Sequence, residues 1–352
     1  MSNSHWGRLL TLTTYGESHG PAMGGIVDGM PAGLTLSEAM IQAALDQRRP
    51  GQSSYTTQRR ETDQIQILSG VYQGKTTGTP IGLQINNLDA KSKDYQALKE
   101  VFRPGHAEFT YYQKYGHYDH RGGGRASARE TAIWVAAGSI AQQLLQARLG
   151  VNIYAYCAQI GHLDFDWESK DCISDNPFFI PNTHQIDQAH ELIRQLQRQG
   201  DSVGALVNVV AESVPAGLGE PVFGKLDAEI AHAMMSINAV KAVSIGDGFD
   251  VVAQNGSTHR DAMDTEKTFL SNHAGGILGG IATGQSIRVA LGFKPTSSIR
   301  QPVKTITKQG QATEISVTGR HDPCVGIRGV PVAKAMLALT LADAYLVNQS
   351  KK

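Results

Sequence analysis

The sequence predicts one α+β unit, residues 1–352, built from two halves with a similar order of strands and helices. Seven short runs are apolar or alternate between apolar and polar residues, which is typical of strands. Five longer runs have apolar residues at helical spacing. No Ser/Pro-rich linker and no block of like charge divides the chain, so we expect a single domain without a flexible hinge.

The expected elements follow from these patterns in chain order. Apolar or alternating runs place strands at residues 8–13, 24–28, 64–70, 81–86, 151–160, 203–212 and 286–293. Helical spacing places helices at residues 37–48, 127–149, 187–199, 225–236 and 331–346. Pro331 suits the first turn of the last helix, because that position needs no backbone N–H. Gly200 follows the third helix, where glycine commonly ends a helix.

Short strings recur in the same order along the chain. Pro31-Ala32-Gly33-Leu34 follows an expected strand and precedes a helix, as does Pro215-Ala216-Gly217-Leu218. Ile67-Leu68-Ser69-Gly70 recurs as Ile277-Leu278-Gly279-Gly280. The repeated order indicates a degenerate duplication with two interleaved β–α halves. Chance similarity between short glycine-containing strings is the alternative.

The composition excludes several classes of protein. Lys plus Arg (32) equals Asp plus Glu (32), so bulk charge does not favour nucleic acid, and 41% hydrophobic residues argue against disorder. The longest apolar candidate, residues 132–145, is interrupted by Gly, Ser and Gln, so we expect no membrane span. No signal peptide is visible, which makes a cytoplasmic protein the expectation. Three scattered cysteines without CxxC spacing indicate neither a disulfide scaffold nor a zinc site.

Glycine is over-represented, with 38 residues, and it is clustered. The cluster Gly122-Gly123-Gly124 is consistent with a loop-rich fold, but also with a site lined by main-chain N–H groups that bind an anion. Arg125 and Arg129 flank Ser127 directly after these glycines, at the start of an expected helix. Helix N-termini and arginines both attract anions, so this segment is a candidate phosphate or carboxylate site.

Two histidines are the candidates for proton transfer near neutral pH. One lies in Gly16-Glu17-Ser18-His19-Gly20 and the other in Arg103-Pro104-Gly105-His106. The first string fits the G-x-S-x-G pattern of a hydrolase, but Pro21 follows it where a helix is required, so we reject that interpretation. His190-Glu191 lacks a second histidine at position 194, and we expect no catalytic metal.

Six strings together resemble the chorismate synthase family. They are Gly16-Glu17-Ser18-His19-Gly20, Arg103-Pro104-Gly105-His106, Arg121-Gly122-Gly123-Gly124-Arg125-Ala126-Ser127-Ala128-Arg129-Glu130-Thr131, Ser271-Asn272-His273-Ala274-Gly275-Gly276-Ile277-Leu278-Gly279-Gly280, Lys294-Pro295-Thr296-Ser297-Ser298 and Gly319-Arg320-His321-Asp322-Pro323-Cys324. The resemblance is collinear from about Gly7 to Tyr345 and therefore specific.

The resemblance implies a β–α–β sandwich, with helices between two antiparallel sheets, assembled as a homotetramer. It implies a lyase reaction, the 1,4-elimination of phosphate from 5-enolpyruvylshikimate 3-phosphate to give chorismate, without net redox change. The implied cofactor is reduced FMN, which supplies electron density transiently while phosphate leaves. The chain has no spare segment for a flavin reductase domain, so the implied reductant is external, or NADPH used weakly by the chain itself.

The resemblance also assigns roles residue by residue. His19 would protonate the departing phosphate, and His106 would keep the flavin monoanionic or protonated. Asp322, with Ser18 and Ser127, would assist a proton relay at the flavin. The implied FMN contacts are Arg125, Ala126, Ser127, Asn238, Ala239, Gly279, Lys294, Pro295, Thr296, Ser297, Ser298 and Arg320. The implied ligands of substrate or NADP phosphate are Arg48, Arg103, Arg129 and Arg320.

The sequence departs from the family pattern at two places. Ser54 stands where a second arginine is usual, and Arg59 or Arg60 is the expected substitute. Ala242 and Ser244 stand where Gly and Glu are commoner. Two other classes of function stay open: a flavin-dependent oxidoreductase that consumes NADPH, and a non-catalytic flavin- or anion-binding paralogue.

Overall fold

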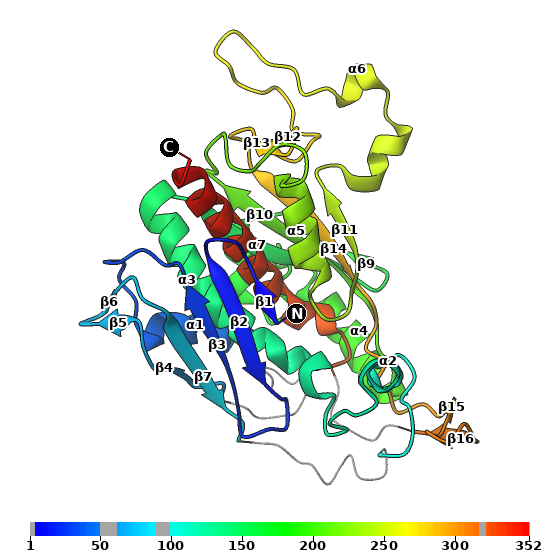
Figure 1. Ribbon diagram of the computed structural model, residues 1–352. Coiled ribbons are helices and arrows are strands. Elements are labelled where there is room, and N and C mark those ends of the chain that lie inside the picture. The colour runs from blue at the N-terminus through cyan, green and yellow to red at the C-terminus, as the bar shows by residue number, and fades with distance from the viewer. Residues whose placement is uncertain (1–3, 50–61, 89–98, 317–321, 352) are drawn as a thin grey trace.

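The computed structural model describes residues 4–49, 62–88, 99–316 and 322–351, and mixes helices with two five-stranded antiparallel sheets (Figure 1). The first sheet has the order β1-β2-β3-β7-β4. Its strands are β1 (His5–Trp6), β2 (Thr11–Gly16), β3 (Ala22–Asp28), β4 (Ile65–Ile67) and β7 (Ile81–Asn86). In β7 alternate residues are buried, which turns one face of this sheet toward the core.

The second sheet has the order β11-β14-β10-β8-β9. Its strands are β8 (Asn152–Ile160), β9 (Leu163–Asp164), β10 (Ala205–Glu212), β11 (Val240–Ile245) and β14 (Ile287–Phe293). Three two-stranded ribbons complete the strands: β5 (Val71–Tyr72) with β6 (Lys75–Thr76), β12 (Ile277–Leu278) with β13 (Ile281–Ala282), and β15 (Val303–Ile306) with β16 (Ala312–Ile315).

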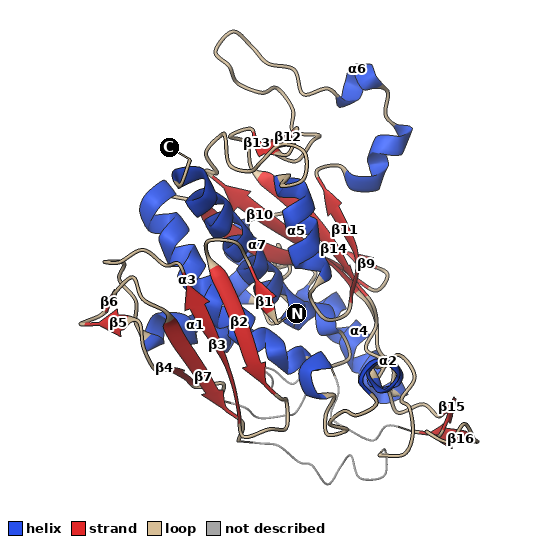
Figure 2. Cartoon of the chain, in the orientation of Figure 1, coloured by secondary structure: helices blue, strands red, loops and turns tan. Residues whose placement is uncertain are grey.

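Two long helices, α3 (Thr131–Leu149) and α7 (Val325–Gln349), lie between the two sheets (Figure 2). The other helices are α1 (Glu38–Arg48), α2 (Glu108–Tyr115), α4 (Ile186–Gln199), α5 (Leu226–Met235) and α6 (Gly256–His259). Helix α3 packs on β3 and β7 of the first sheet and on β8 of the second, while α7 packs on β10, β8 and β14. Because α3 and α7 also pack on each other, they form the middle layer of the core.

Glycines bring the two central helices close together. A Cβ on Gly138 of α3 would lie 2.4 Å from the Cβ of Ala335 in α7 and 2.6 Å from its Cα. On the opposite side of α7, a Cβ on Gly329 would lie 2.5 Å from the ring of Phe293 in β14. Both distances are shorter than carbon atoms tolerate, so this layer admits no side chain at either glycine.

Asp343, near the end of α7, fixes the N-terminal segment. Its Oδ1 accepts hydrogen bonds from the backbone N–H groups of Arg8, Leu9 and Leu10, at 3.1, 2.7 and 2.9 Å. The carboxylate is almost completely buried, and three N–H donors satisfy the polar atom that burial would otherwise leave unpaired. The first and last parts of the chain are therefore joined directly.

Most expected elements are confirmed, and β7 has the predicted bounds. The first expected strand, residues 8–13, begins too early, because Asp343 binds the N–H groups of residues 8–10 and β2 starts at Thr11. The third expected strand shrinks to Ile65–Ile67. The prediction that Pro331 opens the last helix is wrong: α7 starts at Val325 and contains Pro331. Strand β11 was missed because its residues lack clear alternation.

Helix α7 is long and apolar, and so it must be compared with the expectation that the chain has no membrane span. By length and composition it could cross a membrane, but 78% of its apolar window is buried inside the structure. Among the described residues no other helix passes that test. The apolar character of α7 is accounted for by its position between the two sheets.

The two halves of the chain have matching local geometry. In each half four strands occur in the spatial order first, second, fourth and third: β2-β3-β7-β4 and β8-β10-β14-β11. A helix, α1 or α5, follows the second strand, and a core helix, α3 or α7, closes the half. In the two Pro-Ala-Gly-Leu strings, Gly33 N–H donates to Thr76 O at 2.8 Å and Gly217 N–H donates to Ala282 O at 2.9 Å.

The contact between α3 and α7 predicts a substitution effect opposite to helix propensity. Alanine is about 1 kcal/mol better than glycine in a helix interior, but overpacking a core costs about 1–3 kcal/mol. We expect Gly138→Ala to lower the free energy of unfolding by about 1–2 kcal/mol. The measurement is urea denaturation followed by circular dichroism.

Gly256→Ala is the matched control, because a Cβ on Gly256 in α6 would meet nothing within 4 Å. This variant should keep or slightly raise the stability. A Gly138→Ala protein as stable as the unsubstituted chain would contradict the close approach of the two helices.

Candidate functional site

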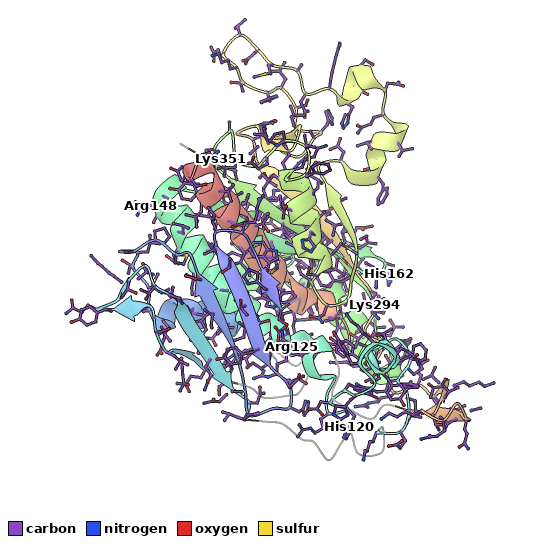
Figure 3. The ribbon with its side chains drawn as sticks, viewed as in Figure 1. His120, Arg125, Arg148, His162, Lys294 and Lys351 are labelled. Atoms are coloured by element: carbon purple, nitrogen blue, oxygen red, sulfur yellow. The ribbon has the colours of Figure 1, made fainter. Side chains whose placement is uncertain are left out.

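A cavity of about 1680 Å³ opens where the N-terminal ends of α3 and α7 meet several loops. Its walls come from residues 103–108, 117–130, 235–241 and 294–298, and from the start of α7. Most of the predicted site residues line it: Arg48, Arg103, His106, Arg125, Ala126, Ser127, Arg129, Asn238, Ala239, Lys294, Pro295, Thr296, Ser297, Ser298 and Asp322. Figure 3 marks Arg125, just before α3, and Lys294, just after β14.

Three predicted residues are not on the described cavity wall. Ser18 and His19 are buried, and a Cβ on Gly122 would lie 2.0 Å from the His19 ring, so His19 packs directly behind a wall residue. Gly279 lies in the turn between β12 and β13, outside the residues that line the cavity. The predictions for Arg320, Ser54, Arg59 and Arg60 fall outside the described residues.

Asp63 holds two of the predicted anion-binding arginines. Its carboxylate oxygens lie 2.7 Å from Nη1 of Arg48 and 2.7 Å from Nη1 of Arg129, and all three side chains are buried. Burial acts to raise the pKa of Asp63, but the two guanidinium groups outweigh it and hold that pKa below its ordinary value. Burial lowers the pKa of Arg48 to about 9, so this side chain stays charged at neutral pH.

Asn87 links this ion cluster to the loop that carries His19. Nε of Arg129 donates to Oδ1 of Asn87 at 2.6 Å, and Nδ2 of Asn87 donates to the carbonyl oxygens of Glu17 and Gly20 at 3.0 and 2.8 Å. The position of residues 17–20 is therefore coupled to the arginine cluster. Sequence reasoning missed Asp63 and Asn87, since an isolated polar residue beside a strand carries no motif.

His106 is held by a contact at each ring nitrogen. Nδ1 lies 3.0 Å from the carbonyl oxygen of Pro104, which accepts only, so Nδ1 carries the proton. Nε2 lies 2.6 Å from Oγ of Ser298, so in the neutral ring it accepts the Ser298 proton. Burial and then the nearby charge of Arg103 lower the pKa of His106. The imidazole is therefore neutral at neutral pH.

The turn that carries His106 docks on the segment after β14. Nζ of Lys294 and Oγ of Ser297 both donate to the carbonyl oxygen of Gly105, at 3.0 and 3.3 Å. A Cβ on Gly105 would lie 2.4 Å from Oγ of Ser297, and Gly105 has φ +72°. Glycine is therefore required for the two segments to approach, and this approach forms one wall of the cavity.

Two predicted arginine ligands and the predicted catalytic residue Asp322 already have ion-pair partners. Nη1 of Arg125 lies 2.9 Å from Oε2 of Glu130, Arg103 is paired with the buried carboxylate of Glu108, and Nη1 of Arg328 lies 2.8 Å from Oδ2 of Asp322. Such pairs fix the arginines in place before a ligand arrives. The charge that an anion meets comes from these guanidiniums, from Lys294 and from the N-terminal ends of α3 and α7.

The residues present fit a flavin mononucleotide together with an anionic substrate. A ligand cavity usually measures about 300–1,000 Å³, so this larger cavity has room for two ligands. Lys294, Ser297 and Ser298 supply donors for a phosphate, and Gly122, Gly123 and Gly124 line the same space. All three glycines there have positive φ, which a residue with a side chain rarely adopts.

Comparison with known proteins gives a consistent result. The sequence model of the family described as chorismate synthase matches residues 10–346. Proteins named chorismate synthase from Francisella tularensis subsp. holarctica (strain LVS) and subsp. novicida (strain U112) are 60% identical over 350 residues, 99% of each chain. A crystal structure of a chorismate synthase matches with a TM-score of 0.77 and 30% identity, covering 97% of this chain and 93% of the other. With the sequence, the fold and the cavity in agreement, the chain belongs to the chorismate synthase family.

Proposed function

We propose that the cavity is where this chain carries out the reaction of its family, the elimination of phosphate from 5-enolpyruvylshikimate 3-phosphate to give chorismate. The observation that carries the proposal is the gathering of Arg48, Arg103 and Arg129, from three distant segments, around one cavity with His106. A substrate with one phosphate and two carboxylates needs several fixed cations. Charge-assisted hydrogen bonds to arginine are the strongest contacts a protein offers to such groups.

Reduced FMN would be held by Lys294, Ser297 and Ser298 on one wall and by Arg125 to Ser127 on the other. When bound, it supplies transient electron density to the substrate while the carbon–oxygen bond to phosphate breaks. Its reduction is proposed to come from an external reductant, with NADPH as the candidate donor. Gly279 and Arg320 remain predicted contacts without support from the described cavity wall.

The chain's own residues would manage the protons. His106, with its proton fixed on Nδ1, presents Nε2 to Ser298 and thus to the same wall as the proposed cofactor residues. The His19 ring lies next to Gly122, which lines the cavity, and His19 is the proposed proton donor to the departing phosphate. Asp322, whose Oδ2 is paired with Arg328, is proposed to assist the proton relay at the flavin together with Ser18 and Ser127.

We also propose a single domain, an internal duplication, a homotetramer and a cytoplasmic location. The matching strand order and turn hydrogen bonds of the two halves support the duplication. Exposed apolar side chains such as Phe223 (96%) and Val252 (84%) support burial against other copies. The core shared by both halves supports a single domain.

An anaerobic assay tests the proposal. The purified chain is mixed with chemically reduced FMN and 5-enolpyruvylshikimate 3-phosphate, and chorismate absorbance is followed. Steady turnover without NADPH is expected. Formation of product only with stoichiometric oxidation of NADPH would point to the oxidoreductase alternative, and flavin binding without product would point to a non-catalytic paralogue.

Removal of His106 should reduce catalysis more than binding. We expect His106→Ala to lower kcat about 10- to 1000-fold, which overlaps the usual range of general acid–base effects, while FMN affinity is largely kept. Stopped-flow single turnovers and flavin fluorescence measure the two quantities. Ser298→Ala keeps the imidazole and removes the hydroxyl at its Nε2, so it should lower kcat less, although it also removes one proposed donor to the FMN phosphate. Near-normal turnover of His106→Ala would show that this histidine is structural.

Removal of the Asp63 charge should act mainly on substrate binding. We expect Asp63→Asn to raise the Michaelis constant about tenfold or more, because Arg48 and Arg129 lose the carboxylate that orients them. Asp63→Glu, which keeps the charge, should recover part of the affinity. Glu212→Gln, which removes an exposed carboxylate paired with Lys170, is the control for charge alone.

The same carboxylate predicts a dependence of stability on pH. The folded pKa of Asp63 lies below its unfolded value of about 3.9, so its contribution is complete above that pH and is lost as pH falls through the folded pKa. Asp63→Asn should therefore flatten the acid limb of a stability–pH profile. An unchanged profile, together with an unchanged Michaelis constant, would contradict a linking role for Asp63.

A further inference from the structure

The chain between β11 and β12 leaves the two sheets as an excursion that carries α6 (Figure 1). This excursion, residues 246–276, contains Asp247, His259 and His273. Among the described residues these three form the group of histidine and carboxylate side chains that could hold a metal ion, with one ligand atom from each within 4.8 Å of the others. The reaction site does not use them, since none lines the large cavity.

We propose that Asp247, His259 and His273 form a binding site for a divalent metal ion such as Zn²⁺. Two imidazoles and one carboxylate suit Zn²⁺, whereas Mg²⁺ and Ca²⁺ prefer oxygen ligands alone. Water would complete a tetrahedral site, as in other zinc sites with three protein ligands.

The ligands are already close to the required positions. Nδ1 of His273 lies 2.6 Å from Oδ2 of Asp247, where the two share a hydrogen bond. Zn²⁺ bonds of about 2.0–2.1 Å at a tetrahedral angle separate two ligand atoms by about 3.3 Å. The pair therefore needs to open by less than about 1 Å, with the metal ion replacing the shared proton.

Neighbouring side chains orient the three ligands. Gln254 connects two of them, because its Nε2 donates to Oδ2 of Asp247 at 2.9 Å and its Oε1 lies 2.6 Å from Nδ1 of His259. Asp261 fixes the loop that carries the third ligand, because its Oδ1 accepts a hydrogen bond from the backbone N–H of His273 at 2.8 Å. Hydrogen-bonded groups behind the ligands are a regular feature of metal sites in proteins.

One nearby cation, the guanidinium of Arg288, lowers the affinity of the site for a metal ion. Nη2 of Arg288 in β14 lies 3.3 Å from Oδ1 of Asp247 and also donates to the carbonyl oxygen of Asn272. The guanidinium engages the oxygen that faces away from His273, which leaves Oδ2 for the metal ion. Its charge lowers the affinity, so we expect an exchangeable rather than permanently bound ion.

The bound ion would join three parts of the excursion: the turn after β11, the end of α6 and the loop before β12. Sequence reasoning did not find the site, because its ligands have no fixed spacing and include no cysteine. The inference does not depend on the proposed reaction, and its test is read from metal binding rather than from turnover.

Zinc titration of the full chain tests the proposal. The protein is stripped with a chelator, and Zn²⁺ is titrated in competition with a chromophoric chelator. We expect one zinc ion bound reversibly per chain, a rise in melting temperature with Zn²⁺ and none with Mg²⁺ at equal concentration. His259→Asn and His273→Asn should each weaken the site at least about tenfold, with circular dichroism showing that both variants fold.

His184→Asn is the matched control. His184 also faces two carboxylates, with its ring nitrogens 3.7 Å from Asp166 and from Glu168, but it is exposed and belongs to no three-ligand group among the described residues. This variant should bind zinc like the unsubstituted chain. Absence of stoichiometric zinc binding, zinc binding that survives both ligand substitutions, or loss of the site in His184→Asn would each overturn the proposal.

Discussion

The contact between α3 and α7 is the constraint on which the rest of the structure depends. The two helices touch through Gly138 and Ala335; α3 packs on both sheets, and α7 packs on the second sheet. Their closeness fixes the spacing of the sheets and places both N-terminal ends at the same cavity. Partial positive charge at two helix ends then adds to the arginines around that cavity. A packing requirement in the core thus produces the electrostatics of the site, and a shift of one helix would alter both.

The sequence predicts helices and strands well where the hydrophobic periodicity is strong. It predicts them poorly where long-range contacts determine where an element begins or ends. Strand β7 matched its prediction because alternate residues face the core along its whole length. The early start assigned to β2 was wrong because Asp343, more than 300 residues away, takes the N–H groups of residues 8–10. The prediction that Pro331 opens the last helix was wrong, because the local preference of proline for a first turn is weaker than the packing of α7 between two sheets.

The family resemblance identified the residues of the site, but it did not identify the side chains that hold those residues in place. The resemblance names Arg48 and Arg129, yet only the folded chain shows that Asp63 lies between them and that Asn87 ties them to the His19 loop. A buried carboxylate that pairs with two distant arginines leaves no spacing to detect. The same holds for Gly122, whose place against the His19 ring depends on two loops meeting across the fold.

The bond between Asp343 and residues 8–10 has a consequence for how the chain is made. On the ribosome the strands of the first sheet emerge before α7, whose Asp343 anchors the segment that precedes β2. Until then α3 lacks its central partner, and the second sheet exposes the apolar face on which α7 packs. Contacts of such long sequence separation form slowly, and nascent chains in that state attract aggregation partners. Synthesis of α7, rather than local folding, is therefore the step that commits this part of the chain to its native state.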